Sequence, residues 1–330
     1  MATFAFERSN PAELPPFANE VLEGPPPTTW RDLKRPKLRR FPRHGEDITW
    51  LDYLGHGIAG LVFKVTIGGG DPVALKIFWR TRRPRPRLLP TGKGYTQDEW
   101  PLEDESHNVA LLEKLEYLIN NPDDERPLPI LRRPKTLADV VANLRGFSDE
   151  VRDSPVIPPL PEDPIRMPDF PPLPACYGWT TVHRDEIPHL VPAASDHVDG
   201  ELGWHWAIVY ELVPGAPQDL AVGQAHLDFF YAMGFAMQGY NPDNWRGGRL
   251  IDMNDLSASF STGWRRPSII PRDAKEWFWT LDFENAPKQK RRLIQRSFKR
   301  KVVSKEEENG AFFDDAKRGT GNNQGLSLDG

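Results

Sequence analysis

The sequence predicts an α+β fold in which an antiparallel sheet precedes a smaller helical region. Between Ile48 and Trp79, short runs of β-branched and aromatic residues alternate with glycine turns, which is typical of antiparallel strands. Apolar residues at helical spacing follow, most clearly over residues 101–119 and 224–237. The 330 residues are enough for one large domain or for two lobes.

The composition excludes several classes of protein. A net charge of −5 with 27% charged residues gives no general affinity for polyanions. The single cysteine, Cys176, excludes an intramolecular disulfide and a cysteine-based zinc site, and it favours a reducing, intracellular compartment. No secretion signal and no apolar run of membrane-spanning length is visible, so we expect no membrane association.

Changes in composition divide the chain into segments. Residues 1–45 are rich in proline and lack a sustained period, so they are predicted to form a flexible arm. Residues 46–215 are predicted to form the sheet-bearing lobe and its hinge, with a proline-rich insertion at 120–174. Residues 216–304 are predicted to form a reduced helical lobe, and residues 305–330 a disordered tail.

The elements of the first lobe follow from local patterns. Three strands are expected between Ile48 and Trp79, and two more in 175–182 and 205–213. In residues 101–119 the apolar side chains fall at helical spacing behind an acidic first turn, which predicts a helix packed on the sheet. These strands together predict a five-stranded sheet.

Three further helices are predicted. One lies in the insertion, where Thr136 and Asp139 resemble a capping box before an apolar stripe. Another follows Gly215 and would place Phe230, Met233 and Met237 on one face. The third spans Lys288 to Val303 and carries a dense basic face.

A glycine-rich stretch follows the first strand. Gly55, Gly57 and Gly60 have the spacing G-x-G-x-x-G, and Val62 lies two residues beyond. Such a stretch is either a hairpin turn or a loop whose backbone N–H groups approach phosphates. The sequence "VALK", with Ala74 and Lys76, follows on a predicted strand, where a lysine could reach the α- and β-phosphates.

A buried lysine needs an anionic partner, because an unpaired ammonium is costly to desolvate. Glu105 is the preferred candidate, since it points to the same face of its predicted helix as Leu112. Glu103 is an alternative. Both acids also suit the first turn of a helix without any functional role.

Five segments together resemble the protein-kinase fold: "GHGIAGLVFKV", "VALKIF", "ESHNVALL", "AIVYELVPG" and "NPDNW…LIDMN". The resemblance covers about residues 46–120 and 171–260. The compact "NWRGGRLID" is more narrowly similar to a fungal group of kinase-like proteins that includes an inner-kinetochore subunit. The resemblance implies a reduced two-lobed kinase-like fold, with an N-terminal antiparallel sheet and a small helical C-lobe.

By position, the resemblance implies a nucleotide site for weakly bound ATP and Mg²⁺. Tyr210 would be the gatekeeper, the residues from Glu211 to Val213 the adenine-facing hinge, and Asn244 and Asp252 the metal ligands. The complete implied set is Gly55, Gly57, Gly60, Val62, Ala74, Lys76, Glu105, Tyr210, Glu211, Val213, Asn244 and Asp252.

The chain departs from the kinase pattern at the catalytic base. Gly239 stands five residues before Asn244, where kinases have an aspartate. Asp243 is a candidate substitute. The D-F-G triplet reads Asp252-Met253-Asn254, and Asp282 in "LDFEN" is a second candidate for the metal-site aspartate.

The predicted basic helix carries Lys288, Lys290, Arg291, Arg292, Arg296, Lys299, Arg300 and Lys301. Such a face is a solvated surface, a nuclear-import signal, or a contact for an acidic partner or nucleic acid. A second basic segment lies at residues 34–40. Nuclear localisation is therefore expected over cytoplasmic, and nucleic-acid binding only through residues 288–301.

The sequence thus predicts a pseudokinase-like module that binds other proteins and retains weak nucleotide binding. One alternative is an active atypical kinase that transfers the γ-phosphate of ATP. Another is a nuclear or kinetochore scaffold without nucleotide binding.

Overall fold

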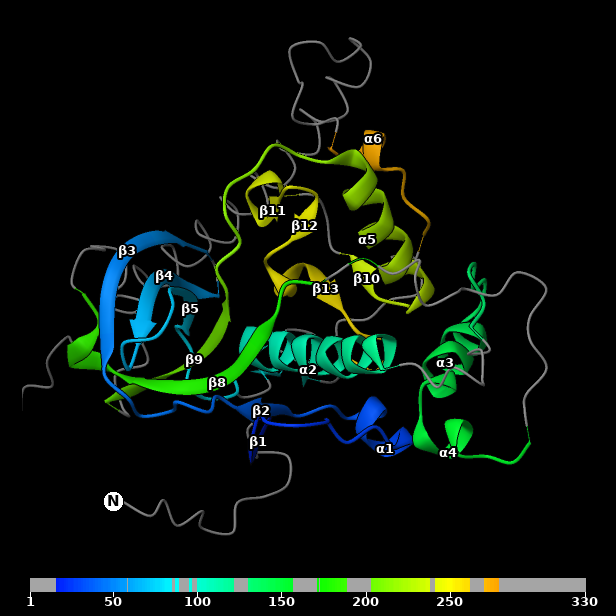
Figure 1. Ribbon diagram of the computed structural model, residues 1–330, viewed down its shortest axis with the longest axis horizontal. Coiled ribbons are helices and arrows are strands. Elements are labelled where there is room, and N and C mark those ends of the chain that lie inside the picture. The colour runs from blue at the N-terminus through cyan, green and yellow to red at the C-terminus, as the bar shows by residue number, and fades with distance from the viewer. Residues whose placement is uncertain are drawn as a thin grey trace, which may run out of the picture. The chain divides into compact units, whose positions relative to one another are not determined.

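The computed structural model describes residues 16–57, 59–84, 87–88, 95–96, 100–121, 130–156, 171, 173–188, 203–237, 241–261 and 270–278. The chain divides into two compact units, 1–278 and 279–330, and all the described residues belong to the first. They form a mixed α+β structure with one large sheet and several helices (Figure 1). The predicted basic helix, the predicted tail and Asp282 lie outside the described residues.

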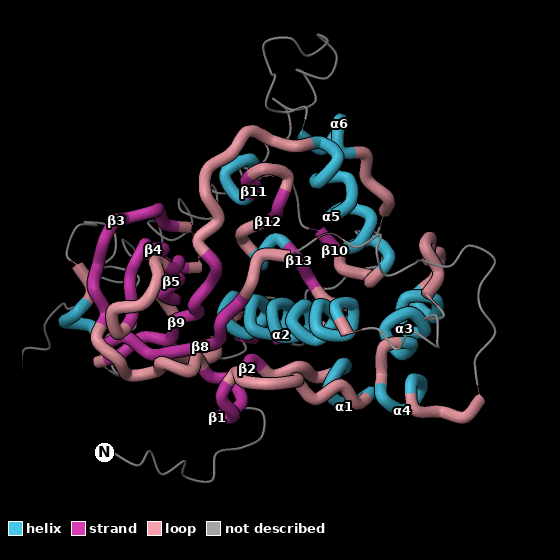
Figure 2. The backbone as a smooth tube through the Cα atoms, viewed as in Figure 1, coloured by secondary structure: helices cyan, strands magenta, loops and turns pink. Residues whose placement is uncertain are grey.

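A seven-stranded sheet dominates the unit (Figure 2). Its strand order is β1-β2-β8-β9-β5-β4-β3. The five predicted strands are confirmed as its antiparallel part. They are β3 (Ile48–His56), β4 (Gly60–Ile67), β5 (Val73–Phe78), β8 (Cys176–His183) and β9 (Trp204–Glu211).

Two further strands come from the segment predicted to be a flexible arm. β1 (Phe17–Val21) pairs in parallel with β2 (Leu38–Arg40), and β2 pairs in parallel with β8. The short helix α1 (Trp30–Lys34) lies between them and buries Leu33. Residues 17–40 are therefore ordered. Pairing of β2 with the distant strand β8 supplies hydrogen bonds to a segment whose own sequence has no strand or helix pattern.

Both faces of the sheet are covered by apolar contacts. On one face, Leu61, Phe63, Val65 and Ile67 of β4 alternate into one hydrophobic cluster. On the other face, residues such as Ile208 join a larger cluster with the helices. A sheet buried on both sides keeps its register, because a slip of one residue would exchange the two faces.

Helix α2 (Pro101–Asn120) follows the sheet strands and confirms the helix predicted at 101–119. Proline at its first position and the acids Glu103 and Asp104 in its first turn favour a helix start there. The helix contacts β2 and the segment around β13 (Leu256–Ser257) (Figure 1). It therefore connects the sheet with the smaller helical region.

The predicted insertion helix is α3 (Leu137–Gly146), and α4 (Asp149–Arg152) follows it. The predicted capping box is confirmed: the Asp139 N–H donates to the Thr136 hydroxyl at 3.1 Å, and the Thr136 N–H donates to the Asp139 carboxylate at 2.9 Å.

The predicted helix after Gly215 is α5 (Leu220–Ala232), capped by Asp219. It ends earlier than its apolar spacing suggested, because Gly234 takes a left-handed conformation with φ of 74°. Met237 therefore belongs to the short strand β10 (Ala236–Met237), paired with β13, and not to the helix face.

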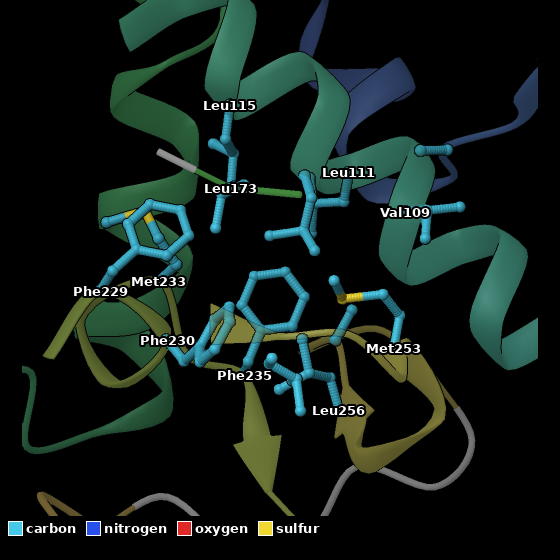
Figure 3. Close-up of a cluster of buried hydrophobic side chains, with 14 of the residues drawn as sticks. Val109, Leu111, Leu115, Leu173, Phe229, Phe230, Met233, Phe235, Met253 and Leu256 are labelled. Atoms are coloured by element: carbon cyan, nitrogen blue, oxygen red, sulfur yellow. The ribbon is translucent and has the colours of Figure 1, made fainter. Parts of the chain in front are cut away.

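The remaining elements are short. They are β6 (Arg87–Leu88), β7 (Tyr95–Thr96), β11 (Trp245–Arg246), β12 (Arg249–Leu250), α6 (Ala274–Phe278) and the 3-10 turns η2 (Arg184–Glu186), η4 (Pro242–Asn244) and η5 (Met253–Asp255). Figure 3 shows Leu111 of α2 above Phe230, Phe235, Met253 and Leu256. This cluster holds the segment after β12 against α2.

None of the helices in the described residues has the length and apolar character needed to cross a membrane.

Candidate functional site

Three residues that the sequence placed in one site meet around a buried lysine. The Nζ atom of Lys76, on β5, lies 2.6 Å from Oε2 of Glu105, on α2. The same Nζ lies 2.7 Å from Oδ1 of Asp252. The side chains of Lys76 and Glu105 are 9% and 1% exposed, while that of Asp252 is 32% exposed. Of these three side chains, that of Asp252 is therefore the most open to solvent.

Glu105 is held by further hydrogen bonds. The Tyr210 hydroxyl donates to Oε1 of Glu105 at 2.6 Å, and the Asn254 amide donates to Oε2. Glu103, the alternative partner of Lys76, instead pairs with Arg83. The predicted Lys76–Glu105 pair is therefore present, and we call Lys76, Glu105, Tyr210, Asp252 and Asn254 the Lys76 network.

The charges in the network are unevenly balanced. Burial disfavours the ammonium of Lys76, but Asp252 and Glu105 outweigh it and raise the lysine pKa above its usual value. Burial also raises the pKa of Glu105, to about 7, against the opposing effect of Lys76. Burial likewise disfavours the charge of Asp252, yet Lys76 holds the pKa of that carboxyl below its usual value. At neutral pH the ion pair of Lys76 with Asp252 is thus the more fully charged.

The position of each network residue follows from its element. Lys76 stands on a central strand between Val62 of β4 and Ile208 of β9, so its side chain faces α2. Glu105 lies in the second turn of α2 and faces the same way as the buried Val109. Asp252 caps η5 by accepting the Asn254 N–H at 3.1 Å.

Asn108, which the sequence analysis did not single out, fixes the Asp252 segment against α2. Its Nδ2 donates to the carbonyls of Met253 at 2.9 Å and Leu256 at 2.7 Å. Its Oδ1 accepts the Ala258 N–H at 3.0 Å. The sequence feature that could have identified Asn108 is an amide within the apolar stripe of a predicted helix. A polar side chain buried there needs hydrogen-bond partners, so it points to a tertiary contact.

Asn244 lies beside the same segment. Its carbonyl accepts the Ile251 N–H at 2.8 Å, and its Nδ2 donates to Asp255 at 2.9 Å. Asn244 and Asp252 each carry a side-chain oxygen, the kind of ligand that magnesium prefers. Within the described part of the chain, no three His, Cys, Asp or Glu side chains gather as a metal site. A magnesium ion here would need further oxygen ligands from phosphates or water.

The glycine stretch forms a tight turn between β3 and β4. The Gly57 N–H donates to the Gly60 carbonyl at 2.9 Å, and the Trp79 indole donates to the Gly57 carbonyl at 3.1 Å. A Cβ at Gly60 would lie 1.9 Å from the carbonyl oxygen of Ile77, so packing alone requires this glycine. A Cβ at Gly57 would meet no atom of the described residues within 4 Å. Gly55 has φ of 145°. The packing of the described residues therefore does not explain why position 57 is a glycine.

The predicted hinge carries an ion pair that the sequence did not suggest. Arg249, on β12, donates to both oxygens of Glu211 at 3.0 and 2.9 Å. These bonds hold the pKa of Glu211 below its usual value, although burial opposes them. Glu211 also accepts the Ala175 N–H at 3.0 Å, and Val213 is half-buried. Glu211 of the predicted hinge is therefore bound to the hairpin that β11 and β12 form.

The remaining predicted residues are separate from the Lys76 network. Val62 and Ala74 are half-buried on the sheet face that carries Lys76. Asp243 is exposed, and its N–H donates to Asn241 at 3.3 Å. Gly239 lies outside the described residues.

Residues 22–115 match the model of the family described as kinetochore Sim4 complex subunit FTA2. The matched segment includes Lys76 and Glu105 but ends before Tyr210 and Asp252. No curated protein matches this chain in sequence.

Proposed function

We propose that the protein is a subunit of a kinetochore complex and acts there by binding other proteins. The observation that carries this proposal is the match of residues 22–115 to a family of kinetochore complex subunits. A kinetochore subunit works in the nucleus, so nuclear localisation follows from the same proposal. The matched residues include α1, β2 to β5 and most of α2, so the match covers several elements and not a single short motif.

The test is localisation together with purification. A fluorescent fusion of the full chain is expected to colocalise with a centromere marker in the source cells. Affinity purification of the same fusion is expected to recover other kinetochore proteins, with the tag alone as the control. A diffuse signal together with no recovered kinetochore protein would overturn the proposal.

We further propose that this subunit has a kinase-like fold. Lys76 lies on the third of the antiparallel strands β3, β4 and β5, and it pairs with a glutamate of the following helix. Protein kinases use the same pair to position the phosphates of ATP. Asp252 lies two residues after the short hairpin of β11 and β12 and also pairs with Lys76. In protein kinases the metal-binding aspartate occupies the corresponding position. These contacts support a kinase-like fold. Gly239, which stands where kinases have their catalytic base, supports a pseudokinase and not an active enzyme.

Weak, magnesium-assisted nucleotide binding is a second candidate function. It is favoured by the Lys76–Glu105 distance and by an Asp252 side chain that is partly open to solvent. A kinetochore scaffold without nucleotide binding is the competing possibility, because Asp252 and Glu105 already neutralise Lys76.

Calorimetric titration of the purified chain with ATP, with and without Mg²⁺, separates these two possibilities. We expect weak binding that Lys76→Met abolishes. Lys64→Met is the matched control, since Lys64 lies on β4 two residue pairs from the Val62–Lys76 pair and on the same sheet face. Equal ATP binding by wild type and Lys76→Met would contradict the assigned role of the lysine, and no heat in either would favour the scaffold.

A further inference from the structure

The short helix α1 and the residue after it carry three exposed cations, Arg31, Lys34 and Arg35. None of the three forms an ion pair with a carboxylate in the part of the chain that the structure describes. The one acid of the helix, Asp32, accepts from the Thr29 hydroxyl instead. Arg31 lies three residues before Lys34 and four before Arg35, so the three charges are neighbours and repel one another. This part of the surface therefore carries an unbalanced positive charge.

Two aromatic rings lie beside these charges. The Lys34 ammonium is 5.4 Å from the centre of the Trp30 ring, within the range of a cation–π interaction. Phe260, which follows β13, packs edge-on against Trp30 with the ring centres 5.8 Å apart. Phe260 is 40% exposed, although it is a large apolar residue. We call Trp30, Arg31, Lys34, Arg35 and Phe260 the α1 surface, which has an apolar centre next to a cluster of cations.

Contacts on its inner side hold α1 in place. Leu33 is fully buried on that side of the helix. The Trp30 N–H donates to the carboxylate of Glu150 at 2.8 Å, and the Thr28 hydroxyl donates to Asp149 at 2.6 Å. Both acids belong to α4. A backbone that is already fixed reduces the entropy that a partner must remove on binding.

We propose that the α1 surface binds a segment of a partner protein in which carboxylates flank an apolar side chain. The carboxylates would pair with Arg31, Lys34 and Arg35, and the apolar side chain would lie against Trp30 and Phe260. Aromatic residues and arginine are enriched in protein interfaces and among the side chains that contribute most to binding. Complementary charge adds specificity and speeds association.

A nucleic-acid duplex fits this surface less well. Duplex DNA carries phosphates along its whole length and binds broad basic surfaces. The exposed carboxylate of Glu150 lies next to the Trp30 backbone, so a negative charge stands at the edge of the α1 surface. A peptide can place its carboxylates opposite the cations alone, whereas a duplex cannot. The exposed ring of Phe260 also gains nothing from a phosphate backbone.

The inference rests on the proposed role in a protein complex and names the chemistry of one partner contact. Trp30, Arg31, Lys34 and Arg35 fall within the segment that matches the kinetochore family, while Phe260 lies beyond it. The α1 surface shares no residue with the Lys76 network. Binding here is therefore independent of any nucleotide.

The test begins with a phage-displayed library of random peptides, selected on the purified full chain. We expect the selected peptides to combine acidic residues with leucine or aromatic residues. The folded double variant Arg31→Gln, Lys34→Gln is expected not to select this class. Arg184→Gln with Lys275→Gln is the matched control, because it removes the same charge from exposed positions on η2 and α6. The proposal is wrong if no such class is enriched, or if the double variant selects it equally well.

Calorimetric titration of one selected peptide then separates the two parts of the surface. Arg31→Gln, Lys34→Gln is expected to weaken binding at least about tenfold, and the loss should shrink at high salt. Phe260→Ala is expected to weaken it at least about fivefold, which a purely electrostatic contact would not show.

Two results of these titrations would also overturn the proposal. One is unchanged affinity in Phe260→Ala. The other is a mixed-sequence DNA duplex that binds more tightly than the peptide in the same buffer, which would make the surface a nucleic-acid contact. Localisation to the kinetochore is measured separately, so failure of the α1 surface leaves the proposed function intact.

Discussion

At the scale of single residues, Lys76 is one cation between two carboxylates. Removing two charges from water costs several kcal/mol unless each group is well bonded. Tyr210 and Asn254 supply additional donors to Glu105, and the Asn254 N–H supplies one to Asp252. The site is therefore a hydrogen-bonded unit in which each member depends on the others.

The first prediction concerns the pH dependence of stability. The folded-state pKa of Glu105 is raised to about 7, above its unfolded value of 4.5. The folded protein then keeps a proton that the unfolded chain loses, so this contribution to stability falls as the pH rises from about 4.5 to 7. Glu105→Gln removes the titration. The stability difference, wild type minus variant, should therefore decrease by up to about 3 kcal/mol over this window.

Urea unfolding at several pH values measures this difference. Glu103→Gln, in the preceding turn of α2 and paired with Arg83, is the control and should show no comparable trend. A wild-type-to-Glu105→Gln difference that stays constant from pH 4.5 to 7.5 would show that Glu105 is ionised throughout.

Asn108→Ala provides a second test at this scale. The change leaves the carbonyls of Met253 and Leu256 and the Ala258 N–H without their amide partner. We expect a loss of about 2–4 kcal/mol in the free energy of unfolding. Asn121→Ala at the exposed end of α2 should cost well under 1 kcal/mol. Similar costs for the two variants in denaturant unfolding would contradict the assigned role of Asn108.

The residue scale also shows what spacing can and cannot reveal. The Lys76–Glu105 pair was predictable in part, because an ordered series of motifs pointed to Lys76 and favoured Glu105 over Glu103 as its partner. Asn108 and Arg249 were not predicted, because their partners lie far away in the sequence. The nucleotide and metal roles of all the predicted site residues, Lys76 and Glu105 included, stay predictions.

At the scale of elements, local patterns predicted the antiparallel strands, α2 and α3 well. Each of these has its own alternation, stripe or cap. β1 and β2 were predicted as a flexible arm, because their stability comes from pairing with β8 and from apolar contacts with distant elements. α5 was predicted too long, because Gly234 ends it within a run that keeps helical spacing.

The ordered state of the arm can be tested with Leu38→Ala. Leu38 is fully buried on β2, so truncation should cost about 2–5 kcal/mol in the free energy of unfolding. Leu51→Ala is the control, since Leu51 is 48% exposed on β3. A flexible arm would instead give no difference between the two variants in urea unfolding.

At the scale of the whole molecule, the sequence predicted the α+β class and the order of its five antiparallel strands along the chain. The two-lobed kinase-like architecture stays a proposal, supported by the contacts of Lys76. Tertiary contacts such as the Glu211–Arg249 pair, which ties the hinge to a hairpin, could not be read from local patterns. They depend on how complete elements pack.

A phosphoryl-transfer assay tests the silent-enzyme prediction for the whole protein. A positioned base contributes about 10²–10⁴-fold to such a reaction, and Gly239 has no side chain to supply it. Purified wild type is therefore expected to transfer radiolabelled phosphate at the background level set by Asp252→Asn. Robust transfer that disappears in Asp252→Asn would instead establish an active atypical kinase, and Asp243→Ala would then show whether Asp243 acts as the base.

The parallel pairing of the arm with β8 also has a consequence for folding kinetics. The Trp179 indole donates to the Ala18 carbonyl at 2.8 Å across 161 residues of sequence. On the ribosome, β1 and β2 emerge before β8, and β2 cannot take its place until β8 has been synthesised. Closing so long a loop is slow compared with forming the β3–β4–β5 meander, whose contacts are local. The arm strands, although they precede β8 in the chain, are therefore expected to be among the last to join the sheet.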